Sequence, residues 1–115
     1  MASKASVEWC AGFFEGEGNA TVRKHNKKTR PNIYPCLALQ VAQVYREPLD
    51  AICEVLGGKV RGPYGPYSST RQAYYQWSIT GKDSIPVAEK LIPLMFRKGV
   101  QVQEALNEYK EYLNG

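Results

Sequence analysis

The sequence predicts a single α+β domain whose elements follow the order helix, strand, strand, helix, strand, strand, helix, helix. Apolar and polar residues alternate in the predicted strands, as in Tyr75, Trp77 and Ile79 against their polar neighbours, which indicates half-buried strands. Stretches expected to be helical stand around them. With 115 residues and no linker, repeat or low-complexity segment, the chain is expected to fold as one domain over residues 1–115.

Turn residues separate these elements. Helices are expected at about 6–17, 47–56, 84–96 and 100–113, and strands at about 19–26, 33–45, 59–64 and 73–80. Ser6 has the side chain of an N-cap and begins the first helix. The second helix ends at 57–58, the fourth strand is closed by 81–83, and residues 98–99 separate the last two helices.

The first helix carries the most informative pattern. Gly12 and Gly16 lie four residues apart at the edge of an apolar arc, where each costs about 0.5–1 kcal/mol relative to alanine, so close approach of another backbone explains them best. Glu17 falls inside that arc, where an unpaired carboxylate is costly unless it meets a cation or reaches the helix end. Gly18 indicates that the helix stops there. Glu15 points to the other side, so one chain does not present a carboxylate pair.

The run from Cys10 to Gly18, CAGFFEGEG, resembles the motif of the LAGLIDADG homing endonucleases. The order of elements resembles their α-β-β-α-β-β-α half-domain over essentially the whole chain. This resemblance implies a curved antiparallel four-stranded saddle with helices on its convex side and its concave side along the DNA major groove. Because family members with a single motif act as homodimers, it also implies a symmetric dimer. The residues expected in the dimer interface are Ala11, Gly12, Phe13 and Gly16.

The same resemblance implies a metal-dependent endodeoxyribonuclease that leaves short 3′ overhangs. Glu17 matches the second acid of the motif, which binds the metal in the family, and the backbone carbonyl of Gly16 is the other expected ligand. Oxygen ligands suit Mg2+; Mn2+ is expected to be tolerated and Ca2+ to bind without turnover. The family has a glutamine and a lysine around the attacking water. Gln43 matches the first and Lys98 the second, with Arg97 as the competing assignment.

Basic and polar residues indicate a surface for double-stranded DNA, with a long pseudo-palindromic target implied by the resemblance. The net charge is +4, and no acidic residue occurs from Arg23 through Arg46. Glutamine pairs well with adenine edges and arginine with guanine, so the preferred base readers are Gln40, Gln76, Arg23 and Arg61. The cations of the basic turn over residues 23–30 are expected to touch phosphate more often than bases, namely Lys24, Lys27, Lys28 and Arg30. The predicted DNA-binding set is Thr21, Arg23, Lys24, His25, Lys27, Lys28, Arg30, Tyr34, Gln40, Lys59, Arg61, Tyr74, Gln76 and Ser78.

Other residue types narrow the function. Cys10, Cys36 and Cys53 have no metal-ligand spacing and are interpreted as small core residues of a protein from a reducing compartment, either a bacterial or phage-host cytoplasm or an organelle matrix. No apolar run of about 18 residues and no leader pattern is present, so neither membrane insertion nor secretion is expected. His25 is the only histidine, which argues against Ser/His/Asp or Cys/His hydrolysis.

Simpler interpretations stay open for each feature. The helix at 6–17 is compatible with an ordinary amphipathic helix that has a glycine end, and the polar strand residues with any solvated sheet face. The basic turn is compatible with a solvated hairpin tip, Gln43 with a strand end, and Lys98 with a helix C-terminal cation. At the level of function, one alternative is a non-cleaving LAGLIDADG-derived nucleic-acid-binding protein, either an intron maturase or a transcription regulator. Another is a small interaction module that dimerises through helix 6–17.

Overall fold

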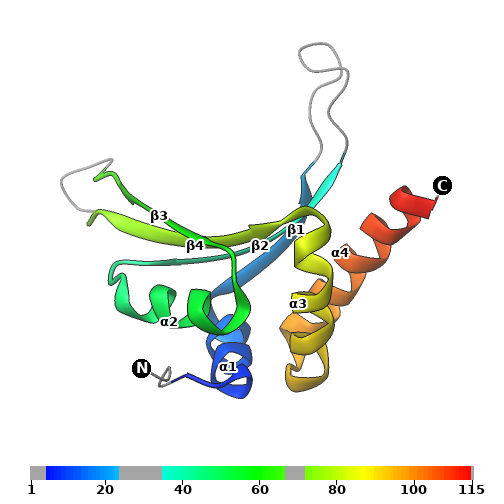
Figure 1. Cartoon of the computed structure of the whole chain (residues 1–115), viewed down its shortest axis with the longest axis horizontal. Helices are drawn as coiled ribbons and strands as arrows, with labels where there is room; N and C mark the ends of the chain where they lie inside the picture. Colours follow the sequence, from blue (N-terminus) through cyan, green and yellow to red (C-terminus); the bar gives the residue numbers. More distant parts are fainter. Residues whose placement is uncertain (1–4, 24–34, 67–71, 115) are drawn as a thin grey trace, which may run out of the picture.

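The computed structural model describes residues 5–23, 35–66 and 72–114, which form a curved antiparallel sheet with helices on one side (Figure 1). The sheet has the strand order β1-β2-β4-β3. The predicted α+β class and order of elements are confirmed. In chain order the elements are α1 (Val7–Glu17), β1 (Gly18–Arg23), β2 (Cys36–Gln43), α2 (Glu47–Leu56), β3 (Lys59–Tyr64), β4 (Tyr74–Thr80), the 3-10 turn η1 (Gly81–Asp83), α3 (Ser84–Leu91), the 3-10 turn η2 (Ile92–Leu94) and α4 (Arg97–Asn114).

Helix α1 begins at a side-chain cap and passes directly into β1. The Ser6 hydroxyl accepts a hydrogen bond from the Trp9 amide at 3.1 Å, as its N-cap assignment predicts. Gly18 follows α1 with φ −84° and ψ 168°, which is extended backbone that any residue adopts. Glycine is required there for space, because a Cβ on Gly18 would lie 2.5 Å from the buried ring of Phe14. The close contact between α1 and the start of β1 therefore fixes the direction in which the helix leaves the sheet.

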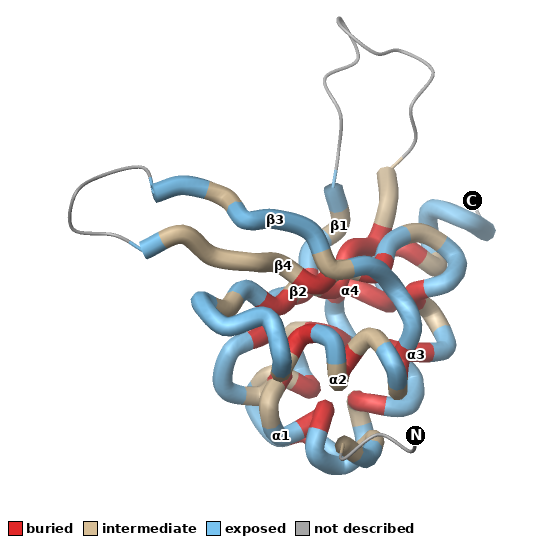
Figure 2. Tube along the Cα trace, turned by 60° about the vertical axis from the view of Figure 1, so that its left-hand side comes forward, coloured by how far each residue is buried: buried red, intermediate tan, exposed pale blue. Residues whose placement is uncertain are grey.

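The core lies between the sheet and the helices, as the band of buried segments in Figure 2 shows. Leu37, Leu39 and Val41 of β2 are almost completely buried, and Trp77 of β4 is fully buried. This confirms the predicted alternation of these strands. The Trp77 indole N–H donates to the Gly57 carbonyl at 2.8 Å, which ties the end of α2 to β4. The helix residues of this core include Phe14, Leu49, Ile52, Leu91, Val102 and Leu106.

The last two helices differ from their predicted bounds. Helix α3 ends at Leu91 and is followed by η2, because Pro93 has no N–H for the helix ladder and its ring crowds the preceding turn. Helix α4 already begins at Arg97, so Lys98 and Gly99 lie in its first turn and do not separate two helices. Gly99 is buried against the chain leaving α3: a Cβ there would lie 3.2 Å from the Ile92 carbonyl oxygen.

Strand β2 ends earlier than the alternation predicts. Strand β2 spans Cys36–Gln43, and residues 44–46 form a bend before α2, whose first turn contains Pro48. Strand β1 ends its described part at Arg23, so the predicted extension over 24–26 lies outside the described residues. Strand β3 has an irregular register between Arg61 and Tyr64, after which Tyr64 again pairs with Tyr74. These bounds leave a saddle whose open face is free of helices.

Candidate nucleic-acid interface and acid site

The open face of the sheet carries polar side chains in cross-strand rows. Directly opposed residues of antiparallel strands have side chains on the same face. Lys59 pairs with Ser78, Ser78 with Gln40, and Gln40 with Asn19, so one polar row crosses all four strands. In the neighbouring row Arg61 pairs with Gln76. The alternation of the strands therefore gathers the predicted base readers of β2, β3 and β4 on the face opposite the core.

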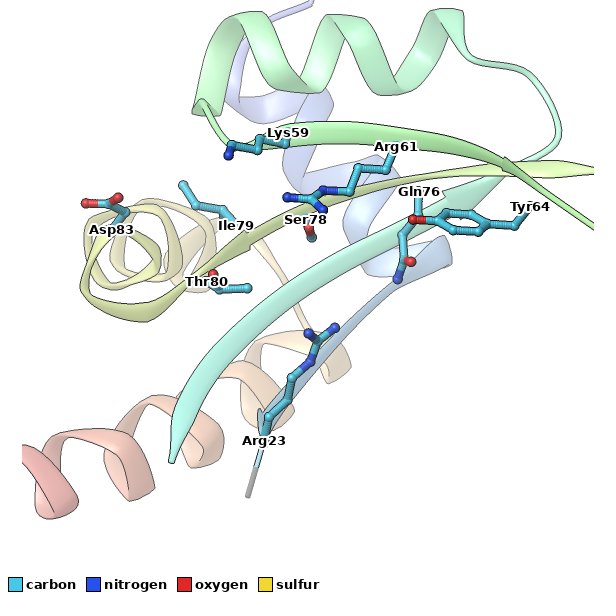
Figure 3. Close-up of a pocket in the computed structure, with 10 residues that line it drawn as sticks. Arg23, Lys59, Arg61, Tyr64, Gln76, Ser78, Ile79, Thr80 and Asp83 are labelled. Carbon is cyan, nitrogen blue, oxygen red and sulfur yellow. The ribbon is translucent and has the colours of Figure 1, made fainter. Parts of the chain in front are cut away.

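A groove of about 610 Å³ runs over this face (Figure 3). Arg23 from β1 and Arg61 from β3 enter it from opposite edges of the sheet, and Gln76 and Ser78 form part of its floor. Three cationic side chains line it against one acid, Asp83. The groove is therefore suited to a polyanion. Its described lining consists of Arg23, Gly58, Lys59, Arg61, Tyr64, Gln76, Ser78, Ile79, Thr80 and Asp83.

The remaining members of the predicted DNA-binding set divide in two. Thr21 is exposed on β1, and Tyr74 of β4 is half-buried beside Tyr64, with ring centroids 5.5 Å apart. Gln40, one of the preferred base readers, is half-buried in the polar row but is not part of the groove lining. The rest of the set lies outside the described residues, namely Lys24, His25, Lys27, Lys28, Arg30 and Tyr34.

The C-terminal end of α1 presents an acid. Cys10, Ala11 and Phe14 bury one face of this helix, while Glu17, its last residue, is exposed. The last turn contains no basic residue. Carbonyls in the last turn of a helix lack intrahelical partners, and the helix dipole makes that end negative, so a carboxylate there attracts a cation. Ideal helix geometry places Glu17 close to the buried Cys10 in the apolar arc, as predicted, but Glu17 is exposed as the last residue of the helix.

Carboxylate and carbonyl oxygens at this end are hard ligands of the type that Mg2+ prefers. The exposed Glu17 side chain and the Gly16 carbonyl therefore fit a divalent cation in chemistry. Among residues 5–23, 35–66 and 72–114, no group of three or more His, Cys, Asp and Glu side chains is arranged to hold a metal ion.

Gly12 and Gly16 of α1 form a surface without side chains, called the glycine surface below. Within the described chain, and apart from the helix's own backbone and the neighbouring residues, nothing lies within 4 Å of a Cβ built on Gly12 or Gly16. Trp9 is 41% exposed next to them, and its ring lies 5.2 Å from that of the half-buried Phe13. Ala11, in contrast, is only 1% exposed and belongs to the core. Its predicted place in a dimer interface is wrong, because its side chain faces inward.

The two other predicted catalytic residues lie toward the same end of the fold. Gly18 pairs with Val41, so β2 reaches Gln43 at the end of the sheet where α1 arrives. Gln43 is half-buried and pairs with Tyr75, which puts it on the helix-covered side of β2, at its rim. Lys98 is half-buried in the first turn of α4, whereas the sequence placed it before a helix that begins at about residue 100.

Glu15 is the residue that sequence reasoning did not assign. Its carboxylate accepts hydrogen bonds from the amides of Phe96, Arg97 and Lys98 at 2.8–3.3 Å. The prediction that Glu15 points away from Glu17 fits this contact, but nothing local in the sequence identifies its partner. One signal could have shown that α4 needs a distant cap: Met95 and Phe96 precede Arg97, and neither side chain can accept a hydrogen bond from the free amides.

The three cysteines are free thiols and are not among the described residues that line the groove, although Cys36 is half-buried and pairs with Arg23. Burial raises the pKa of the Cys10 thiol to about 11, so this group stays protonated at neutral pH and is a core side chain rather than a nucleophile. Burial is also the main cause of a raised pKa at Cys53, whose Sγ donates to the Gly58 carbonyl at 3.3 Å. None of the described helices has the length and apolar character needed to span a bilayer.

The fold is that of the LAGLIDADG homing endonucleases, as the motif at 10–18 predicted. No protein-family profile matches the sequence, and no curated protein matches it. Among solved structures, that of the homing endonuclease I-CvuI with its target in the presence of 2 mM Ca superimposes with a TM-score of 0.74 at 22% identity, over 94% of this chain and 68% of that one. The group I intron-encoded homing endonuclease I-CeuI, complexed with DNA, gives 0.65 at 20% identity over 99% and 57%. The I-LtrWI LAGLIDADG homing endonuclease bound to target DNA gives 0.59 at 22% identity over 97% and 36%.

Proposed function

We propose that this protein is a site-specific double-strand DNA endonuclease that acts as a homodimer and hydrolyses phosphodiester bonds with a divalent metal. The observation that carries the proposal is the exposed carboxylate of Glu17 at the end of α1, beside two glycines that no other described segment contacts, on a fold whose sheet carries a cationic groove. A nuclease of this kind needs each of these parts: an acid for the metal, a second copy, and a face for DNA.

The groove supports binding of the DNA duplex. Arg23, Lys59 and Arg61 supply positive charge along it, and Gln76 and Ser78 supply hydrogen-bonding groups between those charges. Arginine makes paired hydrogen bonds to guanine edges, and glutamine does so to adenine edges, in the major groove. We assign Gln76, Arg23 and Arg61 to base contacts and Lys59 to phosphate contacts, because lysine acts mainly as a point charge.

The α1 surface supports the homodimer. Glycines in a helix interior cost stability, and among residues 5–23, 35–66 and 72–114 no side chain packs on Gly12 or Gly16 in return. A second copy of α1 that packs across them would use their lack of side chains for close backbone approach, with the half-buried Phe13 and the exposed Trp9 at the edge. In a two-fold arrangement the two Glu17 side chains would come from symmetry-related helix ends, one for each DNA strand.

Glu17 and the Gly16 carbonyl would hold Mg2+, which neutralises charge on the scissile phosphate and makes a bound water more acidic. We expect Mn2+ to replace it and Ca2+ to support binding alone. Gln43 would orient the attacking water through its amide, and the Lys98 ammonium would stabilise negative charge at the phosphate. Cuts on the two strands across the minor groove would leave short 3′ overhangs.

The decisive experiment is cleavage of a randomised, partly palindromic duplex library by the purified protein in Mg2+ and, in parallel, in Ca2+. We expect discrete ends in Mg2+ only, and Glu17→Gln to lower cleavage by at least about a hundredfold while the selected duplex is still retained. Glu104→Gln makes the same charge change at an exposed position of α4 and is expected to cut normally. If the unmutated protein retains duplexes without cutting them, the nuclease is contradicted and a nucleic-acid-binding protein is left. If it neither cuts nor retains any duplex, DNA is not its substrate or its partner.

A further inference from the structure

A carboxylate from α1 caps a helix that begins about 80 residues later in the chain. Glu15 Oε1 accepts from the Arg97 amide at 2.8 Å, and Oε2 accepts from the Phe96 amide at 3.1 Å. The Lys98 amide is shared between the two oxygens, at 3.3 Å and 3.2 Å. These amides belong to the start of α4, where a helix has N–H groups without intrahelical partners and a positive dipole end. One side chain therefore caps three amides at the start of α4.

The local sequence gives α4 no cap of its own. Phe96 precedes the first helical residue, and its side chain has no acceptor for the free amides. The Phe96 side chain is instead 85% exposed. The hydrogen bonds of Glu15 thus connect the first turn of α4 directly to α1.

The cap joins two residues of the proposed active site. Glu15 precedes Glu17 by two residues on the same helix, and it binds the backbone of Lys98 directly. A second hydrogen bond to α4 follows on the other side of Glu17, where the Gln101 side-chain amide donates to the side-chain Oδ1 of Asn19 at 3.1 Å. Glu17 is therefore flanked in sequence by two residues that hold α4. A shift of α4 relative to α1 would break these hydrogen bonds.

We propose that Glu15 is a positioning residue of the active site: its carboxylate fixes the start of α4, and with it Lys98, relative to Glu17. This inference rests on the proposed function. It separates the two acids of the motif by role, because Glu17 faces solvent as a ligand and Glu15 is engaged by backbone amides. The dimer surface, the acid and the lysine are then carried by one rigid unit of α1 and the first turn of α4.

The test is a double-mutant cycle on the cleavage step. Glu15→Gln keeps the size of the side chain but loses the charge and turns an N–H2 group toward the amides. We expect it to lower the single-turnover rate about 10- to 100-fold with the DNA dissociation constant unchanged within about twofold, as for a small misplacement of a catalytic group. In a Lys98→Ala background, Glu15→Gln should have little further effect, because the group that it positions is gone. The matched control is Glu104→Gln, which replaces an exposed acid on α4 itself. It should leave the single-turnover rate unchanged in both the unmutated and the Lys98→Ala background.

Equal loss from Glu15→Gln in both backgrounds would overturn the proposal, since a general loss of structure lowers both rates alike. If Glu15→Gln does not yield folded protein, Glu15→Asp enters the same cycle; it retains the charge but is one methylene shorter, and its smaller loss of rate should likewise vanish without Lys98. A readout that needs no cleavage is amide hydrogen exchange at 96–98, which should accelerate in Glu15→Gln and not in Glu104→Gln. If the unmutated protein does not cut, the proposed function fails; accelerated exchange would then support the cap itself, and unchanged exchange would refute it.

Discussion

Replacing Gly12 by alanine separates the stability of one protomer from the stability of a dimer. The residue lies in the middle of α1, and nothing in the described chain would contact the added methyl within 4 Å, apart from the helix itself and adjacent residues. Alanine is favoured over glycine in a helix interior by about 0.5–1 kcal/mol. In the isolated protomer we therefore expect Gly12→Ala to raise the free energy of unfolding by that amount.

The same methyl should weaken the dimer. If two α1 helices pack across Gly12, each protomer adds one methyl to a backbone contact that has no room for it, and overpacking costs about 1–3 kcal/mol at each site. A symmetric pair then loses about 2 kcal/mol or more, which weakens the dimer dissociation constant at least about 30-fold. One substitution is thus expected to stabilise the monomer and destabilise the dimer.

The assay combines urea unfolding at low protein concentration with sedimentation equilibrium over a wide concentration range. Gly18→Ala is the matched control, because its Cβ would meet the Phe14 ring at 2.5 Å inside the protomer, so it should destabilise the monomer itself. An unchanged dimer dissociation constant in Gly12→Ala, with the monomer more stable, would refute the glycine surface as the dimer interface. A less stable monomer would refute the open space around Gly12.

Two further predictions concern the groove and the core. Lys59→Ala should weaken DNA binding about equally for all sequences and reduce the slope of the log binding constant against log salt concentration by about 1, because one phosphate contact is lost. The control Lys90→Ala removes an exposed lysine of α3 and should leave this slope unchanged. If Lys59→Ala also leaves the slope unchanged, Lys59 does not contact DNA. The second concerns alkaline pH: since burial raises the pKa of Cys10 from 9.0 to about 11, the folded protein holds this proton more tightly than the unfolded chain. Stability is then fully present below about pH 9 and declines by about 2 kcal/mol as pH rises toward 11. Chemical unfolding in that range should show a smaller decline for Cys10→Ala, where the raised pKa of Tyr109 still contributes, and an equal decline in both proteins would contradict this account.

The strands and the first helix could be predicted because their signals are local. Alternation along β2 and β4 identified the buried Leu39 and Trp77 and the opposite face with Gln76, since strand residues alternate by geometry alone. The Ser6 cap set the start of α1, and the bounds of α2 and β3 agree with the predicted ranges. The choice of residues for the open face therefore needed no tertiary information beyond the order of the strands.

The end of the chain was predicted less well because distant groups determine it. The predicted helix over 84–96 stops at Leu91, where Pro93 interrupts the ladder. The next helix begins at Arg97, three residues earlier than predicted, because the Glu15 carboxylate satisfies amides that the local sequence leaves without a partner. Ala11 was assigned to the dimer interface because it belongs to the motif, and the motif alone does not say which of its side chains face the core of the same protomer.

The sequence by itself determined the class of fold, the alternation of the sheet, the motif with its second acid at Glu17, and the cationic and amide side chains of the open face. The motif and its second acid follow from the resemblance to a known family, and the other features follow from periodicity, capping and residue chemistry within a few positions of one another. Only the tertiary structure decided that Arg23 and Arg61 share one groove, that Gly12 and Gly16 have no neighbour within the described protomer, and that Glu15 holds the start of α4. Each of these depends on which segments the folded chain brings into contact, and a side chain's partner across about 80 residues leaves no periodic signal in the sequence.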